Sequence, residues 1–91
     1  MDFEWDGAKS EKNHRERGFG FDLAALIFEG PVIEWCDVRE VWGEARMVAV
    51  GSVADAILAV VYADRGSVRR IISARRAREK EAELWQWSVS P

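Results

Sequence analysis

The segment RMVAVGSVADAILAVVYADRGSVRRIIS, residues 46–73, decides the fold. It contains three runs that are rich in β-branched and aromatic residues, which is the composition of β-strands. Short stretches of Gly, Ser and Asp separate the runs and are typical of turns. The runs lie at 46–50, 57–62 and 68–73, and the turns at 51–55 and 64–67. Because connections this short join neighbouring antiparallel strands, we predict a β-meander.

Upstream of the meander, the residues indicate one further strand and a short helix. Residues 32–37 read as a strand, and the polar stretch 39–44, which contains Gly43, reads as a turn or loop. The stretch FDLAALIF at 21–28 has helical apolar spacing and stops before Gly30-Pro31. We therefore predict a short buried helix there.

The N-terminal part begins with the alternating triplet Phe3-Glu4-Trp5, which is typical of a short strand. Asp6 follows as a candidate N-cap, and the charged residues after it predict an exposed helix that Gly18 closes. At the other end, strong helix formers begin at Ala74 with ARRAREKEAELW, and residues 88–91 are expected to form a frayed tail.

This order of elements predicts an α+β fold, in which an antiparallel sheet of about four strands packs with two N-terminal helices and one C-terminal helix. A chain of 91 residues with 48% hydrophobic residues suits a single domain over residues 1–91. The single cysteine, Cys36, excludes an intramolecular disulfide. The acidic N-terminus is unlike a signal peptide, and the longest apolar stretch, 56–63, is too short to span a bilayer. The expected compartment is the cytoplasm, without membrane contact.

The formal net charge of −3 is unevenly distributed. Before Arg65 there are 6 basic and 13 acidic residues, whereas from Arg65 onward there are 7 basic and 3 acidic residues. A local basic segment is what nucleic-acid binding requires, and it can occur in a protein that is acidic overall. The C-terminal third is therefore the candidate nucleic-acid-binding region.

Several enzyme classes find no support in the sequence. His14 is the only histidine and lies far from Cys36, so no zinc-ligand spacing is present. The chain has no GxSxG elbow or P-loop, and the stretch 18–20 lacks the third glycine of a dinucleotide-binding turn. No pair of carboxylates is placed for a two-metal site. We expect neither a metal nor an organic cofactor.

The arginines between Arg65 and Arg76 can serve a reaction that needs no metal. RNA carries its own nucleophile, the 2′-hydroxyl, so an enzyme has to align it, stabilise negative charge and move protons. Guanidinium groups suit phosphate oxygens, and the start of a helix after Ala74 would add backbone N–H donors. Strand periodicity places Arg70 with Ile72 on one face, and Arg69, Ile71 and Ser73 on the other. We expect the guanidinium groups to converge on one exposed hollow.

Simpler interpretations stand beside this one. The arginine run also fits a solvated face with surface ion pairs. His14 is expected to face solvent, and Cys36 to be a small core residue. Trp5, Trp35 and Trp85 fit a core, whereas Trp42 and Trp87 fit a protein contact. The proton acceptor stays open among Lys9, Lys12, His14 and a carboxylate such as Glu4.

Residues along almost the whole chain, about 3–85, resemble the BrnT family of bacterial toxins. The features that carry the resemblance are FEWD at 3–6, Lys9, Asn13, Gly18, Phe21, FEGP at 28–31, Glu44, Arg46, Gly51, Arg65-Gly66 and RIISAR at 70–75. The resemblance implies a RelE- or ParE-like fold and a metal-independent ribonuclease that arrests translation. It also implies a BrnA-type antitoxin, expected to be a ribbon-helix-helix protein, whose complex with the toxin binds operator DNA.

By motif position, the resemblance implies a catalytic set of Lys9, Arg65, Arg70, Ser73 and Arg75. Charge and location add Lys12, Arg69 and Arg76 as RNA-binding residues. The chain departs from the common family pattern at three positions: Arg17 stands where a histidine is common, Gly20 where a serine is common, and Arg69 where an apolar residue is usual. Two alternative functions are a non-catalytic antitoxin-binding module and a ParE-like inhibitor of DNA gyrase.

Overall fold

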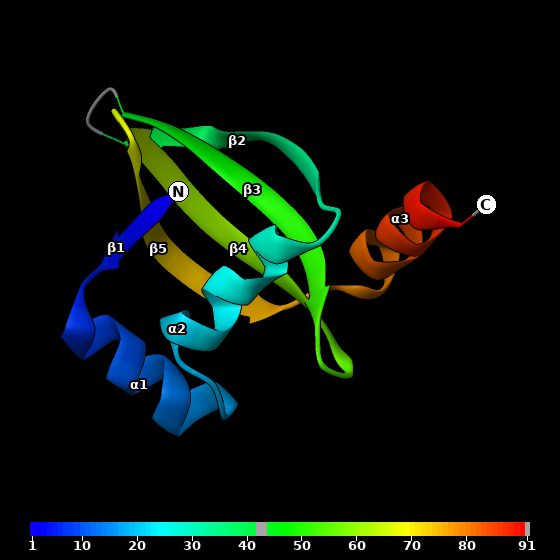
Figure 1. Cartoon of the computed structure of the whole chain (residues 1–91), viewed down its shortest axis with the longest axis horizontal. Helices are drawn as coiled ribbons and strands as arrows, with labels where there is room; N and C mark the ends of the chain where they lie inside the picture. Colours follow the sequence, from blue (N-terminus) through cyan, green and yellow to red (C-terminus); the bar gives the residue numbers. More distant parts are fainter. Residues whose placement is uncertain (42–43, 91) are drawn as a thin grey trace.

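The computed structural model describes residues 1–41 and 44–90 and shows a curled sheet with helices at its sides (Figure 1). In chain order, the elements are β1 (Asp2–Trp5), α1 (Gly7–Arg17), α2 (Phe21–Ala24), the 3₁₀ helix η1 (Ala25–Glu29), β2 (Ile33–Val41), β3 (Glu44–Val53), β4 (Ala56–Arg65), β5 (Val68–Arg76) and α3 (Glu79–Val89). The α+β class is therefore confirmed. None of the described helices is long and apolar enough to cross a bilayer.

The sheet has five strands in the order β1-β5-β4-β3-β2. The meander from β2 to β5 is antiparallel throughout, as the sequence predicted. The expectation of a purely antiparallel sheet of about four strands is wrong, because β1 joins the sheet parallel to β5, with Asp2 beside Val68 and Trp5 beside Ile71. Beyond Ile71, β5 therefore has no strand on its outer side.

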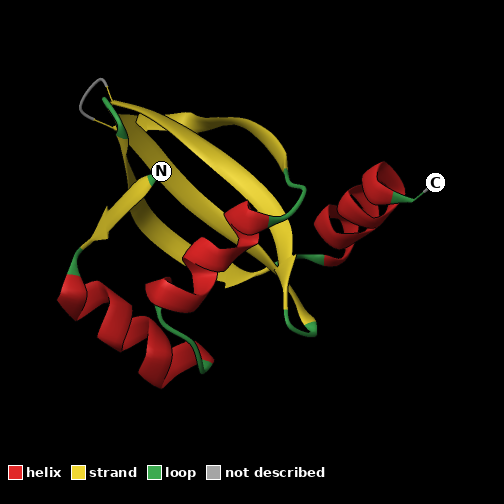
Figure 2. Ribbon diagram, in the orientation of Figure 1, coloured by secondary structure: helices red, strands yellow, loops and turns green. Residues whose placement is uncertain are grey.

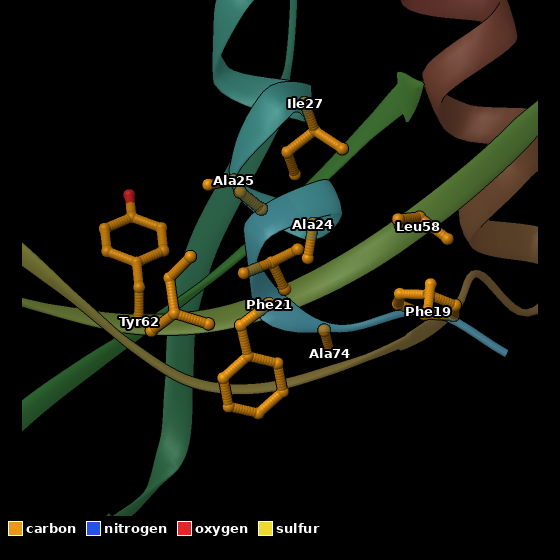
Figure 3. Close-up of a cluster of buried hydrophobic side chains, with 11 residues drawn as sticks. Phe19, Phe21, Ala24, Ala25, Ile27, Leu58, Tyr62 and Ala74 are labelled. Carbon is orange, nitrogen blue, oxygen red and sulfur yellow. The ribbon is translucent and has the colours of Figure 1, made fainter. Parts of the chain in front are cut away.

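Each face of the sheet has its own apolar core. The face that we call the α2 face carries Leu58, Val60, Tyr62, Ile71 and Ala74, which pack against Phe19, Phe21 and Ile27 (Figure 3). The opposite face, which we call the α3 face, carries Val48, Val50 and Ala59 and packs against Trp85 of α3. Figure 2 shows α3 apart from the other helices, at the end of the sheet. Much of the α3 face is therefore left to polar side chains.

A β-bulge in β5 changes the faces that its side chains occupy. Val61 lies opposite Ser73 and Tyr62 lies opposite Ile71, so Ile72 is an extra residue. Strict alternation would place Ser73 on the α2 face with Ile71, as the sequence predicted. The bulge instead turns Ser73 to the α3 face, where Arg70, opposite Ala63, also projects.

The C-terminal helix begins later than expected. Its residues favour helix from Ala74, yet β5 continues to Arg76, and Ala77 N–H still donates to the Ile57 carbonyl at 2.9 Å. Backbone pairing with β4 therefore overrides local helix propensity at 74–76. The expected frayed tail is also wrong at Ser88 and Val89, because α3 extends to Val89 and the Ser88 hydroxyl donates to the Trp85 carbonyl at 2.7 Å.

Other local expectations have mixed outcomes. The predicted helix at 21–28 is split between α2 and η1. Most of the predicted loop at 39–44 belongs to β2 and β3, and Trp42 and Gly43 lie outside the described residues. Cys36 is exposed, contrary to the prediction of a core residue, because it lies on edge strand β2 and its thiol reaches only Met47 Sδ, at 3.6 Å. Trp35 on the same edge strand is also exposed rather than core.

Asn13 fixes the C-terminal end of α1. It is 5% exposed and is the one buried polar residue in the described part of the chain. Its side-chain amide donates to the Phe19 carbonyl at 2.9 Å, and its Oδ1 accepts from Arg17 Nη1 at 3.0 Å. Arg17 Nη1 also donates to the Ala74 carbonyl on the open edge of β5, at 3.2 Å. These contacts join α1, the following loop and β5.

We predict that Asn13→Ala lowers the free energy of unfolding by about 2 kcal/mol, because it leaves the Phe19 carbonyl without its donor. Urea denaturation followed by circular dichroism measures the change. His14→Ala, at an exposed neighbouring position, should change stability by less than about 0.5 kcal/mol. Equal stability of the two variants would contradict the role of Asn13.

Candidate functional site

A groove of about 540 Å³ lies between α1 and the α3 face of the sheet. We call it the α1 groove. Helix α1 supplies one wall, and β2, β3 and the bulged part of β5 supply the other. Its lining residues are Lys9, Lys12, Asn13, Glu16, Arg17, Phe21, Asp37, Arg46, Ile72 and Ser73. The groove thus brings together three residues of the predicted site, Lys9, Lys12 and Ser73.

The charge of the α1 groove is positive. Four of its lining residues are cationic and two are acidic, although the chain as a whole is acidic. Lys12 and Glu16 form an ion pair at 4.0 Å. Because both side chains are exposed to solvent, Glu16 compensates the charge of Lys12 only weakly. Because clefts focus the field of the charges that line them, the groove attracts anions.

Arg46 is one of the lining residues that sequence reasoning did not assign to the site. It lies on β3 opposite Asp37 in the strand register, and its Nε is buried without a hydrogen-bond partner in the described structure. A buried, unpaired guanidinium N–H costs free energy unless a ligand accepts from it. A basic residue within a strand otherwise rich in apolar residues was the available signal.

Arg65 and Arg70 lie on the same face as Ser73, near the start of β5. Glu4 Oε1 is 3.7 Å from Arg70 Nη1 and 4.0 Å from Arg65 Nη1. These distances exceed the 2.7–2.9 Å of strong charge-assisted hydrogen bonds. The exposed Glu4 carboxylate therefore holds Arg70 loosely, and Arg70 is placed for contact with an anion on the α3 face.

Arg69 projects from the opposite, α2 face. Its guanidinium lies 4.8 Å from the ring centre of Phe28 and 4.1 Å from that of Tyr62. Two hydrogen bonds, of 2.7 and 3.0 Å, tie it to Asp64, whose pKa they lower. Burial and a hydrogen bond with Glu34 raise the pKa of the Tyr62 hydroxyl to about 12. Arg69 thus completes the packing of the α2 face.

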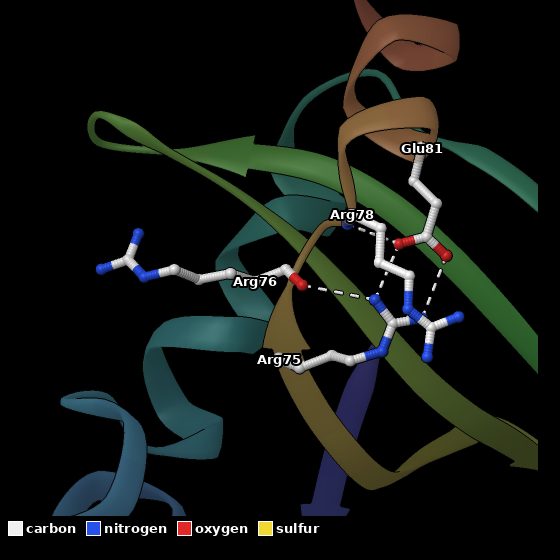
Figure 4. Close-up of polar contacts among 4 residues, drawn as sticks. All are labelled: Arg75, Arg76, Arg78 and Glu81. Atoms are coloured by element: carbon white, nitrogen blue, oxygen red, sulfur yellow. Dashed lines mark hydrogen bonds and ion pairs between the residues drawn. The ribbon is translucent and has the colours of Figure 1, made fainter.

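Arg75 lies on the α3 face but is held by Glu81 at the start of α3 (Figure 4). Two hydrogen bonds, of 2.7 and 3.0 Å, join the guanidinium to the carboxylate. They raise the pKa of Arg75 and lower that of Glu81. Glu81 also accepts from the backbone N–H of Arg78 at 2.8 Å. The start of α3, which was expected to bind a phosphate, is thus occupied by the carboxylate of Glu81.

The prediction that the arginines from Arg65 to Arg76 all converge on one hollow is wrong. Arg69 and Arg76 project from the α2 face, since Arg69 lies opposite Asp64 and Arg76 opposite Leu58. Arg75 shares the face of Arg70 but is bound to Glu81. The structure gathers lysines of α1 with Arg46 and Ser73 instead, and Arg70 lies farther along the same face.

Two groups considered as chemical participants lie elsewhere. His14 is exposed, as predicted, and lines a separate hollow with Trp5 and Asp22. Within the described part of the chain, no three side chains of His, Cys, Asp or Glu gather closely enough to hold a metal ion. The donors in the α1 groove are amines, guanidinium groups, an amide and a hydroxyl, which suit phosphate oxygens.

A family model described as "Ribonuclease toxin, BrnT, of type II toxin-antitoxin system" matches residues 5–81, most of the chain. The matched region contains α1, the whole meander and the start of α3. No curated protein matches the sequence.

The pair of Arg75 and Glu81 predicts a specific dependence of stability on pH. Because the pKa of Glu81 is lowered from its usual 4.5, the pair stabilises the fold above pH 4.5, and this stabilisation is lost as the pH falls through the lowered pKa. Glu81→Gln should cost about 1 kcal/mol at pH 7 and flatten the acid decline. Chemical denaturation at several pH values measures both effects. Glu83→Gln on the exposed side of α3 is the control, and identical profiles for the two variants would refute the role of Glu81.

Proposed function

The chain belongs to the BrnT family of ribonuclease toxins of type II toxin-antitoxin systems, and on this premise we propose that its α1 groove cleaves single-stranded RNA without a metal ion. The observation that carries the proposal is the gathering of Lys9, Lys12, Arg46 and Ser73 around one groove. These residues come from a helix and two strands that are distant in the sequence. The groove offers cationic and hydrogen-bonding groups to a single phosphodiester.

The reaction is an internal transesterification. The ribose 2′-oxygen attacks phosphorus, the bond from phosphorus to the 5′-oxygen breaks, and the products end in a 2′,3′-cyclic phosphate and a 5′-hydroxyl. The substrate supplies the nucleophile, so the protein has to fix an in-line geometry and stabilise the charge on the phosphorane oxygens. Both tasks suit fixed cations at the wall of a groove.

Each group of the α1 groove has a defined part in this reaction. Arg46 donates its unpaired Nε–H to a phosphate oxygen, which satisfies a group that the protein itself leaves without an acceptor. Lys9 and Lys12 stabilise the negative charge from the opposite wall. The Ser73 hydroxyl, which the bulge turns to this face, donates a further hydrogen bond. Arg70 binds an adjoining part of the RNA backbone on the same face.

The proton of the 2′-hydroxyl passes to a carboxylate, and the carboxyl group so formed returns a proton to the departing 5′-oxygen to give the 5′-hydroxyl. Two carboxylates line the α1 groove, Glu16 on α1 and Asp37 on β2, whereas His14 lines another hollow. Arginine is a poor proton acceptor at neutral pH. The structure therefore favours Glu16 and Asp37 over His14 and over Glu4, which lies beside Arg65 and Arg70.

The type II family implies a protein antitoxin as the partner of this chain. We propose that the partner is a BrnA-type ribbon-helix-helix protein, that the complex binds operator DNA through the antitoxin, and that the toxin acts on RNA in the cytoplasm. The net negative charge of the chain before Arg65 suits a partner with basic residues.

The proposal predicts that the purified chain cleaves a defined single-stranded RNA in the presence of EDTA. Lys9→Ala should lower kcat/KM roughly 10- to 100-fold, because it removes a charge that stabilises the transition state. Lys80→Ala on α3 is the matched control and should cleave like the parent chain. Gel electrophoresis gives the rates, and mass spectrometry identifies the cyclic phosphate.

Three outcomes would contradict parts of this proposal. Cleavage that EDTA abolishes would exclude the metal-independent route. Equal rates for Lys9→Ala and Lys80→Ala would place the reaction outside the α1 groove. RNA that stays intact under all conditions, while the antitoxin binds, would favour a non-catalytic binding module; a supercoiling assay would then test the gyrase alternative.

A further inference from the structure

A second cationic hollow lies next to the α1 groove. Its volume is about 350 Å³, and Arg17, Arg75 and Arg76 line it. None of the described residues that line this hollow is acidic, although Glu81 binds Arg75 from the side of α3 (Figure 4). We call it the edge hollow, since it lies at the part of β5 that β1 does not cover. The three side chains come from both faces of the strand and from α1.

The backbone of β5 adds a donor to the edge hollow. Residues of an antiparallel strand direct their N–H and C=O groups alternately to the two sides. Ala77 donates to Ile57 on β4, whereas the Ala74 carbonyl accepts from Arg17 on the outer side. This alternation directs the N–H of Arg76 to the same open edge as the Ala74 carbonyl.

The three arginines differ in how far they are engaged. Arg17 uses Nη1 for Asn13 and Ala74, and its Nε and Nη2 donate to no described residue. Arg75 is bound to Glu81 through both terminal nitrogens and forms a fixed wall. Arg76 is exposed, extends away from Arg75 in Figure 4, and its side chain contacts no acceptor among the described residues. Arg76 is therefore the group most available to a ligand.

Arg17 lines the edge hollow and the α1 groove alike. The cations of the two hollows thus form one continuous track, from Lys9 and Lys12 on α1, through Arg17, to Arg76 on β5. A track of cations beside a groove is how proteins follow the backbone of a single-stranded nucleic acid. A single phosphodiester would occupy only one end of it.

We propose that the edge hollow binds a second phosphate of the RNA, on a nucleotide that flanks the cleaved bond. The planar guanidinium of Arg76 and its backbone N–H bind the phosphate oxygens, and Arg17 fixes the distance between the two phosphate sites. This inference rests on the proposed function for the identity of the ligand. It assigns a positioning part in RNA binding to Arg17, which lines both hollows.

The test is the binding of a fluorescent 2′-O-methyl octanucleotide, which cannot be cleaved because its 2′-oxygens carry methyl groups. Arg76→Ala should weaken binding about fivefold in fluorescence anisotropy. It should also reduce the slope of log Kd against log salt by about 0.7, as expected for one lost phosphate contact with a single strand. Arg76→Lys should restore most of the affinity.

Arg15→Ala is the matched control, because Arg15 is an exposed arginine near the end of α1 that lines neither hollow. Equal affinity and equal salt slope for Arg76→Ala and Arg15→Ala would overturn the second phosphate site. If the two variants behave alike and the parent chain still cleaves RNA, the proposed function stands and only the second phosphate site is refuted. If Arg76→Ala loses binding but no RNA is cleaved, the second site stands and the cleavage proposal fails.

Discussion

The buried side chain of Asn13 is the contact on which the rest of the site depends. It donates to the Phe19 carbonyl and accepts from Arg17, which in turn donates to the Ala74 carbonyl at the open edge of β5. Because a buried amide needs partners in fixed directions, this set of bonds holds α1 at one position beside the sheet. The distance between Lys9 on α1 and Ser73 on β5, and hence the shape of the groove, follows from that position.

A protein with a net charge of −3 can present a positive groove because several of its acidic residues are engaged outside the groove. Asp64 binds Arg69 on the α2 face, Glu81 binds Arg75 at the start of α3, and Asp6 caps α1. The first two carboxylates neutralise arginines that have structural roles, and the third accepts from backbone N–H groups at the start of α1. Arg46 on the α3 face and Arg76 at the edge of β5 make no such ion pair with a described residue, and a phosphodiester backbone can reach them.

Local patterns in the sequence predicted the meander and the first helix correctly, because both depend on near neighbours, as with the cap of Asp6 on α1. These patterns failed where a long-range contact determines the local structure. Pairing with β4 extends β5 over residues that favour a helix, and the bulge at Ile72 moves Ser73 to the other face. Arg46 became a site residue only when β3 and α1 were brought together, and the engagement of Arg75 required the position of Glu81.

The central claim is that RNA lies in the α1 groove, and nuclear magnetic resonance tests its location directly. Titration of a non-cleavable 2′-O-methyl RNA into the ¹⁵N-labelled chain should shift the backbone signals of Lys9, Lys12, Arg46 and Ser73 most. Leu26 and Phe28, on the opposite side of the sheet, should change little. Shifts that gather at Leu26 and Phe28 and spare the groove would contradict the account.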